Sequence, residues 1–316
     1  MMKKVLSRFL AFALAATVLV TFASCSSNAD KNSEEKNGTL IVDSLGNEAY
    51  VKKDARVVSL YGSFAECWQL SGGKLVGVTD DAVKERKMQL DGAEVIGTVK
   101  SPNVEKIVEL NPDYVIMSAD IATQADIKQT LDNAGIAYGY FRVDTFDDYD
   151  KMMKSFCDIN GNAAAYEENV TGVRANIEAI KNKVASKDGG NILLLRAYST
   201  GVKAKTDDNL AGVILNELGA HNIADKHKSL LEELSVEQII QENPQQIFVL
   251  TMGSEDAAVA YLEENIISNP AWAGIDAVKN NKIHILPKEL FHYKPNNRWD
   301  ESYEYIAKIL YENDFE

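Results

Sequence analysis

The sequence is poor in cysteine and histidine. Three cysteines and four histidines occur among 316 residues. An odd number of cysteines gives no complete disulfide framework, and the apolar helical contexts of Cys67 and Cys157 are typical of buried thiols. All four histidines follow residue 220. A histidine-rich metal site drawn from both halves of the chain is therefore excluded.

Positive charge is also scarce. The formal net charge is −14, whereas proteins that bind nucleic acid present a basic face to its phosphates. We therefore predict no nucleic-acid partner. The motifs G-x-S-x-G, H-E-x-x-H, G-x-G-x-x-G and the P-loop are missing too. No nucleophile with a neighbouring base stands out, so we expect a protein that is not an enzyme.

The N-terminus has the pattern of a bacterial export signal. Three basic residues precede an apolar run over 9–22, which is too short to span a membrane. Small residues then lead to Cys25, a pattern that resembles the lipobox of bacterial lipoproteins. We predict a lipoprotein signal peptide over 1–24, a lipid on Cys25 and a flexible, polar tether over 25–38. The alternative is an ordinary cleavable signal with an incidental cysteine.

A short internal repeat indicates two similar halves. Residues 103–117 and 235–249 share Val, Glu, Ile, Asn and Pro in the same order. A repeat of this length suggests two similar lobes. Between the two copies, apolar residues recur at spacings of three and four from Val170 to Val184, which predicts a long helix over 163–187.

These observations predict two α/β lobes with a cleft between them. The N-terminal lobe is expected over 39–162 and the C-terminal lobe over 188–316, joined by the linker helix. Strands that alternate with helices predict mainly parallel sheets. We expect strands over 39–43, 48–51, 56–60, 75–78, 95–96, 114–117, 136–142, 191–197, 247–250 and 282–286.

Three helix starts carry recognisable capping signals. Ser63-Phe-Ala-Glu66 and Ser235-Val-Glu-Gln238 read as capping boxes, and Asn103 reads as an N-cap. Helices are also expected over 123–134, 209–218 and 255–266, and the last helix should bury Trp299, Tyr303, Ile306 and Leu310 on one side.

Three blocks in a fixed order resemble a known family. They are Asp43-Ser-Leu-Gly46 with Arg56-Val-Val-Ser59, then Pro102–Ile107 with Asn111-Pro-Asp113, then Asn269-Pro-Ala-Trp272 with Lys282-Ile-His284. Over residues 39–312 the chain resembles the iron-siderophore and vitamin B12 substrate-binding proteins of ABC importers. The resemblance implies two Rossmann-like lobes with mainly parallel sheets, joined by one long backbone helix.

The resemblance also implies a ligand, a partner and a location. A metal chelate would lie between the lobes, a ferric siderophore first and a corrinoid or haem next, with no permanently bound cofactor. The protein would be a monomer, anchored by its lipid to the outer face of the bacterial cytoplasmic membrane or its periplasmic face. It would dock on an ABC transporter permease dimer through Glu105 and Glu237. An acid in the first turn of a helix also complements the helix dipole. That effect does not explain why the acid occurs in both copies of the repeat.

Ligands of open α/β sheets lie outside the carboxyl ends of the strands. Candidate contacts at these ends and on the loop before the last helix are Tyr61, Ser63, Lys100, Arg196, Tyr198, His292 and Tyr293. Alternatives remain for several of them. Ser63 could instead cap a helix, Arg196 could form a surface ion pair, and the aromatic residues could simply pack against their neighbours. His292 with Tyr61 or Tyr293 could also ligate haem iron. An extracytoplasmic enzyme or an adhesin on the same frame is the alternative function.

Overall fold

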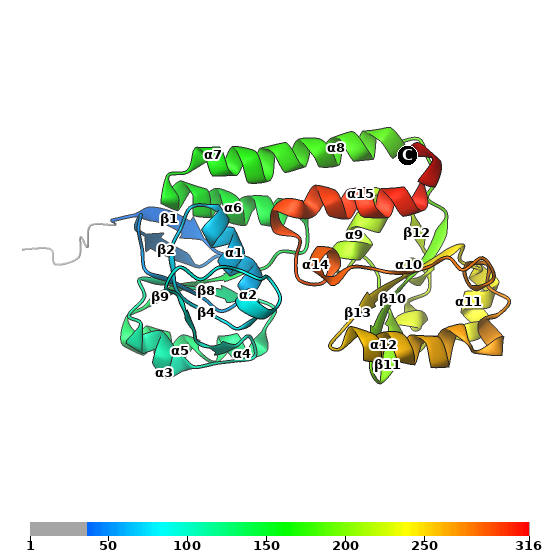
Figure 1. Cartoon of the computed structure of the whole chain (residues 1–316), viewed down its shortest axis with the longest axis horizontal. Coiled ribbons are helices and arrows are strands. Elements are labelled where there is room, and N and C mark those ends of the chain that lie inside the picture. Colours follow the sequence, from blue (N-terminus) through cyan, green and yellow to red (C-terminus); the bar gives the residue numbers. More distant parts are fainter. Residues whose placement is uncertain (1–36, 316) are drawn as a thin grey trace, which may run out of the picture. The chain divides into compact units, whose positions relative to one another are not determined.

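The computed structural model describes residues 37–315 of the chain (Figure 1). The predicted signal peptide, Cys25 and residues 25–36 of the predicted tether lie outside the described residues. Within 37–315, no helix combines the length and the apolar character that crossing a bilayer requires.

The first sheet is fully parallel, as predicted. Its order is β5-β4-β3-β8-β9, so the direction of winding reverses between β3 and β8. The strands are β3 (Val57–Ser59), β4 (Leu75–Val78), β5 (Glu94–Val95), β8 (Tyr114–Ser118) and β9 (Ala137–Phe141). The predicted N-terminal hairpin is β1 (Thr39–Val42) with β2 (Glu48–Val51), and the strands β6 (Gly97–Thr98) and β7 (Ser101–Pro102) form a second short pair.

The second sheet is parallel except at one edge. Its order is β11-β10-β13-β14, and β12 also pairs with β10. The strands are β10 (Asn191–Tyr198), β11 (Gly201–Ala204), β12 (His221–Asn222), β13 (Gln246–Thr251) and β14 (Ile283–Ile285). The sequence analysis missed β11, which turns back antiparallel on β10 through the two residues Ser199 and Thr200.

Helices connect and cover both sheets. Those of the first half are α1 (Gly62–Leu70), α2 (Asp81–Lys84), α3 (Val104–Glu109), α4 (Ala122–Ala125), α5 (Lys128–Ala134) and α6 (Phe146–Asn160). Those of the second half are α9 (Leu210–Glu217), α10 (Ile223–Lys226), α11 (Val236–Glu242), α12 (Glu255–Leu262), α13 (Asp276–Lys279), α14 (Lys288–Phe291) and α15 (Trp299–Leu310). The single helix predicted over 123–134 is wrong in one respect, because it is split into α4 and α5.

The linker helix is continuous over 163–184. It consists of α7 (Ala163–Tyr166), a π-helical turn (Glu167–Thr171) and α8 (Gly172–Val184). The predicted apolar face is buried at Val170, Val173, Ile177 and Val184, and Ile180 is partly buried. The face packs beside α15 (Figure 1). The helix also contacts α6, where Arg174 pairs with Asp147 and Asp150.

One apolar core runs along this helix and reaches both sheets. It includes Val57 of the first sheet, Phe156 of α6, Ile177 of α8, Phe248 of the second sheet and Trp299 of α15. The linker helix is therefore part of a core that both sheets share, rather than a connection between two separate cores. The opposite face of each sheet has its own cluster, in which Val58 and Ile107 represent the first half and Leu193 and Ile239 the second.

The predicted capping box at Ser63 is wrong. Helix α1 begins one residue earlier, at Gly62, with Tyr61 in the N-cap position and no side-chain cap from it. A carboxylate from α2 takes the capping role, since the Gly62 amide donates to Asp81 Oδ2 at 2.7 Å. The Ser63 hydroxyl instead donates to Asn296 Oδ1 at 2.9 Å. A tertiary contact has replaced the local one that the sequence pattern favoured.

Candidate functional site

The winding order of the first sheet indicates where a ligand would bind. In doubly wound sheets, ligands lie at the carboxyl ends of the strands where the order reverses, which here is between β3 and β8. Tyr61 follows β3 at this edge. Burial and the negative charge of Asp81 raise the pKa of Tyr61 to about 12. Its phenol therefore stays protonated at neutral pH and can donate a hydrogen bond.

Gln124 holds this edge together. Its buried side chain donates to the carbonyls of Leu60 at 2.7 Å and Val99 at 3.2 Å, and it accepts from the Ser118 amide at 2.7 Å. One amide thus joins the ends of β3 and β8 to the turn that carries the exposed Lys100. These hydrogen bonds satisfy backbone groups at the ends of both strands.

The segment from His292 to Asn297, here called the 292–297 segment, is tied to the first half of the chain. Arg86, in the loop after α2, donates to the carbonyl of Lys294 at 2.7 Å and to that of Tyr293 at 3.4 Å. Arg86 also pairs with Glu66 of α1, which accepts a hydrogen bond from Asn296. Together with the Ser63–Asn296 bond, these contacts fix the segment beside the edge that Tyr61 occupies.

Lys294 strengthens this attachment at a second point. Its ammonium group donates to the Val143 carbonyl and lies 3.1 Å from Asp144 Oδ1. Residues of α1, of the loop after α2 and of the loop after β9 therefore hold the same short segment. His292 and Tyr293, which the segment carries, are positioned by contacts that come from the other half of the chain.

His292 is neutral in this environment. Burial, with the positive charges of Lys288, Arg196 and Lys294, lowers its pKa to about 4, and Glu85 opposes this only weakly. The Tyr293 ring lies edge-on to the imidazole, with ring centroids 4.9 Å apart. Burial raises the pKa of Tyr293, and a hydrogen bond to Glu85 adds to the effect. Both aromatic side chains are therefore uncharged at neutral pH.

Arg196 is the charged group that the second sheet contributes to this site. It lies inside β10, opposite Lys203 of β11, rather than after the strand as the sequence analysis expected. Its Nε is buried and has no hydrogen-bond partner among the described residues. Its charge acts on both His292 and the carboxylate of Asp208. A buried N–H without a hydrogen-bond partner is costly, unless a ligand supplies an acceptor.

The predicted contacts fall into two groups. The first group consists of four residues that the contacts and charges described above connect, in part through Arg86: Tyr61, Arg196, His292 and Tyr293. Tyr198 ends β10 and is half-buried, and Lys100 is exposed. No described contact joins these two to the first group. Ser63 is only 1% exposed and serves the Asn296 bond.

Three residues that build the site escaped the sequence analysis, namely Arg86, Gln124 and Asn296. Arg86 stands in the run Lys84-Glu-Arg-Lys87, which is typical of a solvated surface. Yet its side chain is only 9% exposed, and burial lowers its pKa to about 10. Nothing local in the sequence distinguishes it. The Asn296 backbone has a φ of 55°, a left-handed conformation that asparagine tolerates.

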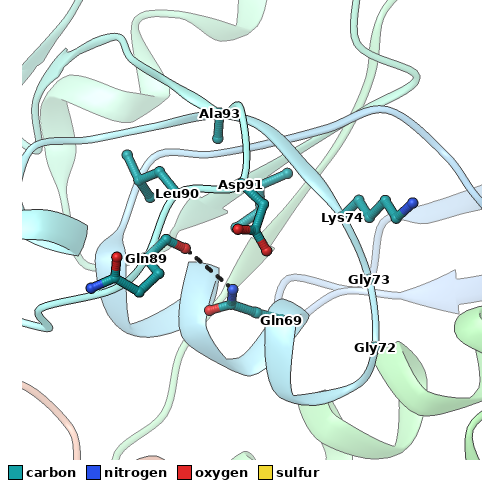
Figure 2. Close-up of a pocket in the computed structure, with 9 residues that line it drawn as sticks. Gln69, Gly72, Gly73, Lys74, Gln89, Leu90, Asp91 and Ala93 are labelled. Atoms are coloured by element: carbon teal, nitrogen blue, oxygen red, sulfur yellow. Dashed lines mark hydrogen bonds between the residues drawn. The ribbon is translucent and has the colours of Figure 1, made fainter.

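A separate cavity lies within the first half of the chain. Figure 2 shows it between the end of α1, the start of β4 and the loop 89–93, where the Gln69 amide donates to the Gln89 carbonyl at 3.4 Å. Its volume is about 440 Å³. No predicted ligand residue lines it. Among residues 37–315, no group of three His, Cys, Asp or Glu side chains is arranged to hold a metal ion.

Comparison with known proteins identifies relatives over most of the chain. The family described as "Periplasmic binding protein" matches residues 57–290. The chain is 27% identical to the Fe(3+)-citrate-binding protein YfmC of Bacillus subtilis over 82% of this chain and 83% of that protein. It is 25% identical to the petrobactin-binding protein YclQ of Bacillus subtilis, over 89% and 90%.

Solved structures share the fold. An ABC transporter substrate-binding protein from Listeria monocytogenes superposes with a TM-score of 0.69 at 21% identity, over 83% of this chain and 100% of that one. The triscatecholate siderophore binding protein FeuA from Bacillus subtilis gives 0.68 at 18% identity, over 88% and 100%. The two-lobed fold and the mainly parallel sheets that the sequence predicts are thus confirmed.

The environment of His292 predicts a dependence of stability on pH. A histidine with a pKa near 4 in the fold and about 6.5 when unfolded binds fewer protons in the folded state. Its contribution is therefore complete above pH 6.5 and is lost as the pH falls toward 4. Between pH 7.5 and pH 5 we expect the free energy of unfolding to fall by about 2 kcal/mol more in the wild type than in His292→Gln.

Urea unfolding at the two pH values measures this difference. Exposed His221, which faces Asp188 at 3.2 Å on the surface, provides the control variant His221→Gln. Parallel pH profiles for the wild type and His292→Gln would contradict the assignment of a buried, neutral imidazole.

Proposed function

Because the chain belongs to the periplasmic binding protein family, we propose that it captures a metal chelate outside the cytoplasm and delivers it to the permease of an ABC importer. The observation that carries this proposal is the partly buried Arg196, whose buried Nε has no hydrogen-bond partner among residues 37–315, together with the neutral His292. A guanidinium binds planar carboxylate, phosphate or hydroxamate oxygens with paired hydrogen bonds. A ferric siderophore is the preferred ligand, followed by a corrinoid or haem.

The proposed binding residues have complementary roles. Arg196 supplies the positive charge, and the protonated phenol of Tyr61 supplies a neutral donor. The Tyr293 phenol is already bonded to Glu85, so this residue offers its aromatic ring. His292 offers a neutral nitrogen and an aromatic face. Lys100 and Tyr198 stand at the ends of neighbouring elements as outer contacts. Two relatives are named for Fe(3+)-citrate and petrobactin, which fits a site that binds oxygen-rich iron chelates.

The remaining features of the proposal concern location and partners. The lipobox-like segment supports a lipid on Cys25, and the relatives YhfQ and YfiY are named as lipoproteins. The protein would then be a monomer tethered outside the cytoplasmic membrane, with no permanent cofactor and no catalytic role. Nothing among the described residues favours the enzyme or the adhesin that the sequence left open.

Docking on a permease dimer is proposed for Glu105 and Glu237. Each is the second residue of its helix, α3 or α11, and each is exposed. The N-caps Asn103 and Ser235 each accept a hydrogen bond from the amide three residues on. Neither glutamate has an ion-pair partner among residues 37–315. Two equivalent, unpaired acids suit a partner that presents two equivalent basic side chains.

The first prediction of this proposal concerns ligand binding. Arg196→Gln keeps a polar side chain but removes the charge, so we expect the dissociation constant for an anionic ferric chelate to rise about tenfold or more. Tryptophan fluorescence of the 37–316 domain measures binding of ferric citrate, a ferric hydroxamate and haemin. Trp68, Trp272 and Trp299 are all fully buried, and Trp299 is the best reporter because it follows the 292–297 segment.

Lys203→Gln is the matched control, because Lys203 lies opposite Arg196 in the ladder but is exposed. It should leave the affinity within about twofold of the wild type. Equal affinities of Arg196→Gln and the wild type for every chelate tested would contradict the role of Arg196.

The second prediction concerns docking. In cells whose own copy of the gene is deleted, the double variant Glu105→Ala with Glu237→Ala should lose chelate uptake while the purified protein binds ligand normally. The reason is that both acids are exposed and serve no internal contact. Uptake of radiolabelled iron gives the readout, and Glu168→Ala with Glu264→Ala controls for the loss of two exposed acids elsewhere on the described surface. Normal uptake by the first double variant would count against docking through these acids.

A further inference from the structure

The helices α3 and α11 are equivalent in three dimensions as well as in sequence. Ile107 and Ile239 occupy the same repeat position and are fully buried, each in the core of its own sheet. Each helix is followed within two residues by an asparagine with a left-handed backbone at the same repeat position, with φ of 44° at Asn111 and 43° at Asn243. Figure 1 shows α3 beside the first sheet and α11 beside the second. The repeat is therefore a structural unit with the same start, face and end.

Each copy of the repeat also carries one apolar side chain that lies outside the core. Among residues 37–315, the prominently exposed large apolar side chains are Leu40, Val42, Leu45, Val83, Val95, Val108 and Ile240. A single exposed aliphatic residue is ordinary. However, Val108 and Ile240 hold the same position of the repeat, and they are 37% and 45% exposed. Core packing explains neither of them.

These two residues lie next to the proposed docking acids. Val108 follows Glu105 by three residues and Ile240 follows Glu237 by three, so each pair shares one helix face. Exposed Glu109 adds a second acid near the first pair, while Glu94 lies 3.9 Å from Lys106. Each half thus presents one unpaired carboxylate beside one exposed aliphatic side chain.

We propose that Val108 and Ile240 are the apolar halves of two matching permease contacts, each seated in an apolar depression beside the basic side chain that meets Glu105 or Glu237. This proposal rests on the proposed docking function and adds to it. A duplicated surface fits a partner with two equivalent sites, and the unpaired Glu105 and Glu237 favour a partner that is basic at both sites. An aliphatic side chain that excludes water strengthens a neighbouring charge pair, which explains why the two features occur together.

Uptake of radiolabelled iron in cells whose own gene copy is deleted tests the proposal. The full-length double variant Val108→Ser with Ile240→Ser should lower the initial uptake rate about fivefold or more. Its melting temperature and its fluorescence titration with ferric citrate, a ferric hydroxamate and haemin should match the wild type. Val108→Ile with Ile240→Val keeps both side chains apolar and should restore uptake. Leu40→Ser with Val42→Ser removes exposed aliphatic residues elsewhere and should have no effect.

Three results would overturn the proposal. Wild-type uptake by Val108→Ser with Ile240→Ser, while the Glu105→Ala with Glu237→Ala variant is defective, would refute the apolar contacts and leave docking by the acids intact. Normal uptake by both double variants would refute both ideas. A dimer of the purified protein that the serine variant dissociates would show that a second copy of this chain, rather than a permease, covers the two side chains.

Discussion

The buried guanidinium of Arg86 is the group on which the candidate site depends. It neutralises Glu66, and it donates to the carbonyls of Tyr293 and Lys294, so that one charge satisfies three acceptors. Burial lowers its pKa only to about 10, and the group stays charged at neutral pH. Removing either member of such a pair leaves an uncompensated buried charge. The 292–297 segment, with His292 and Tyr293, is held in place by this network.

The fold brings distant residues to this network through two features. The reversal of strand order between β3 and β8 places Tyr61 at the edge where ligands of such sheets bind, and Gln124 braces that edge. The apolar core along α8 joins both sheets and α15, which begins directly after the 292–297 segment. Arg196 reaches the site from the second sheet. A ligand held here would thus contact residues that only the tertiary fold assembles.

The sequence predicts the regular parts of this structure well. Periodicity located the linker helix to within three residues of its end, and alternation of strands and helices predicted the parallel sheets. It placed Cys157 in a helical context but gave no bounds for α6, although Thr145 and Asp148 form the capping box that marks its start. It also placed a capping box at Ser63, where Asp81 and Asn296 provide the partners instead. Local patterns fail where a contact from a distant segment is stronger than the local one.

The site is less predictable than the fold, for a physical reason. The expected strand ends suggested Tyr61 and Arg196, although Arg196 lies inside β10, and the loop before the last helix suggested His292 and Tyr293. Arg86 lies in a charged run whose neighbours are solvated, and only its burial distinguishes it. Glu105 and Glu237 were found because the repeat duplicates them. Their apolar neighbours Val108 and Ile240 could be identified only from the exposed fraction of each side chain, which a sequence does not give.

The central claim is that a metal chelate binds beside Tyr61, Arg196, His292 and Tyr293. The most direct measurement is an anomalous difference map, recorded at the iron absorption edge, from crystals grown with the ferric chelate that binds in solution. We predict a single strong iron peak whose chelate contacts Arg196 and the 292–297 segment. An iron peak in the cavity of Figure 2, or at any place remote from Arg196, would contradict the account.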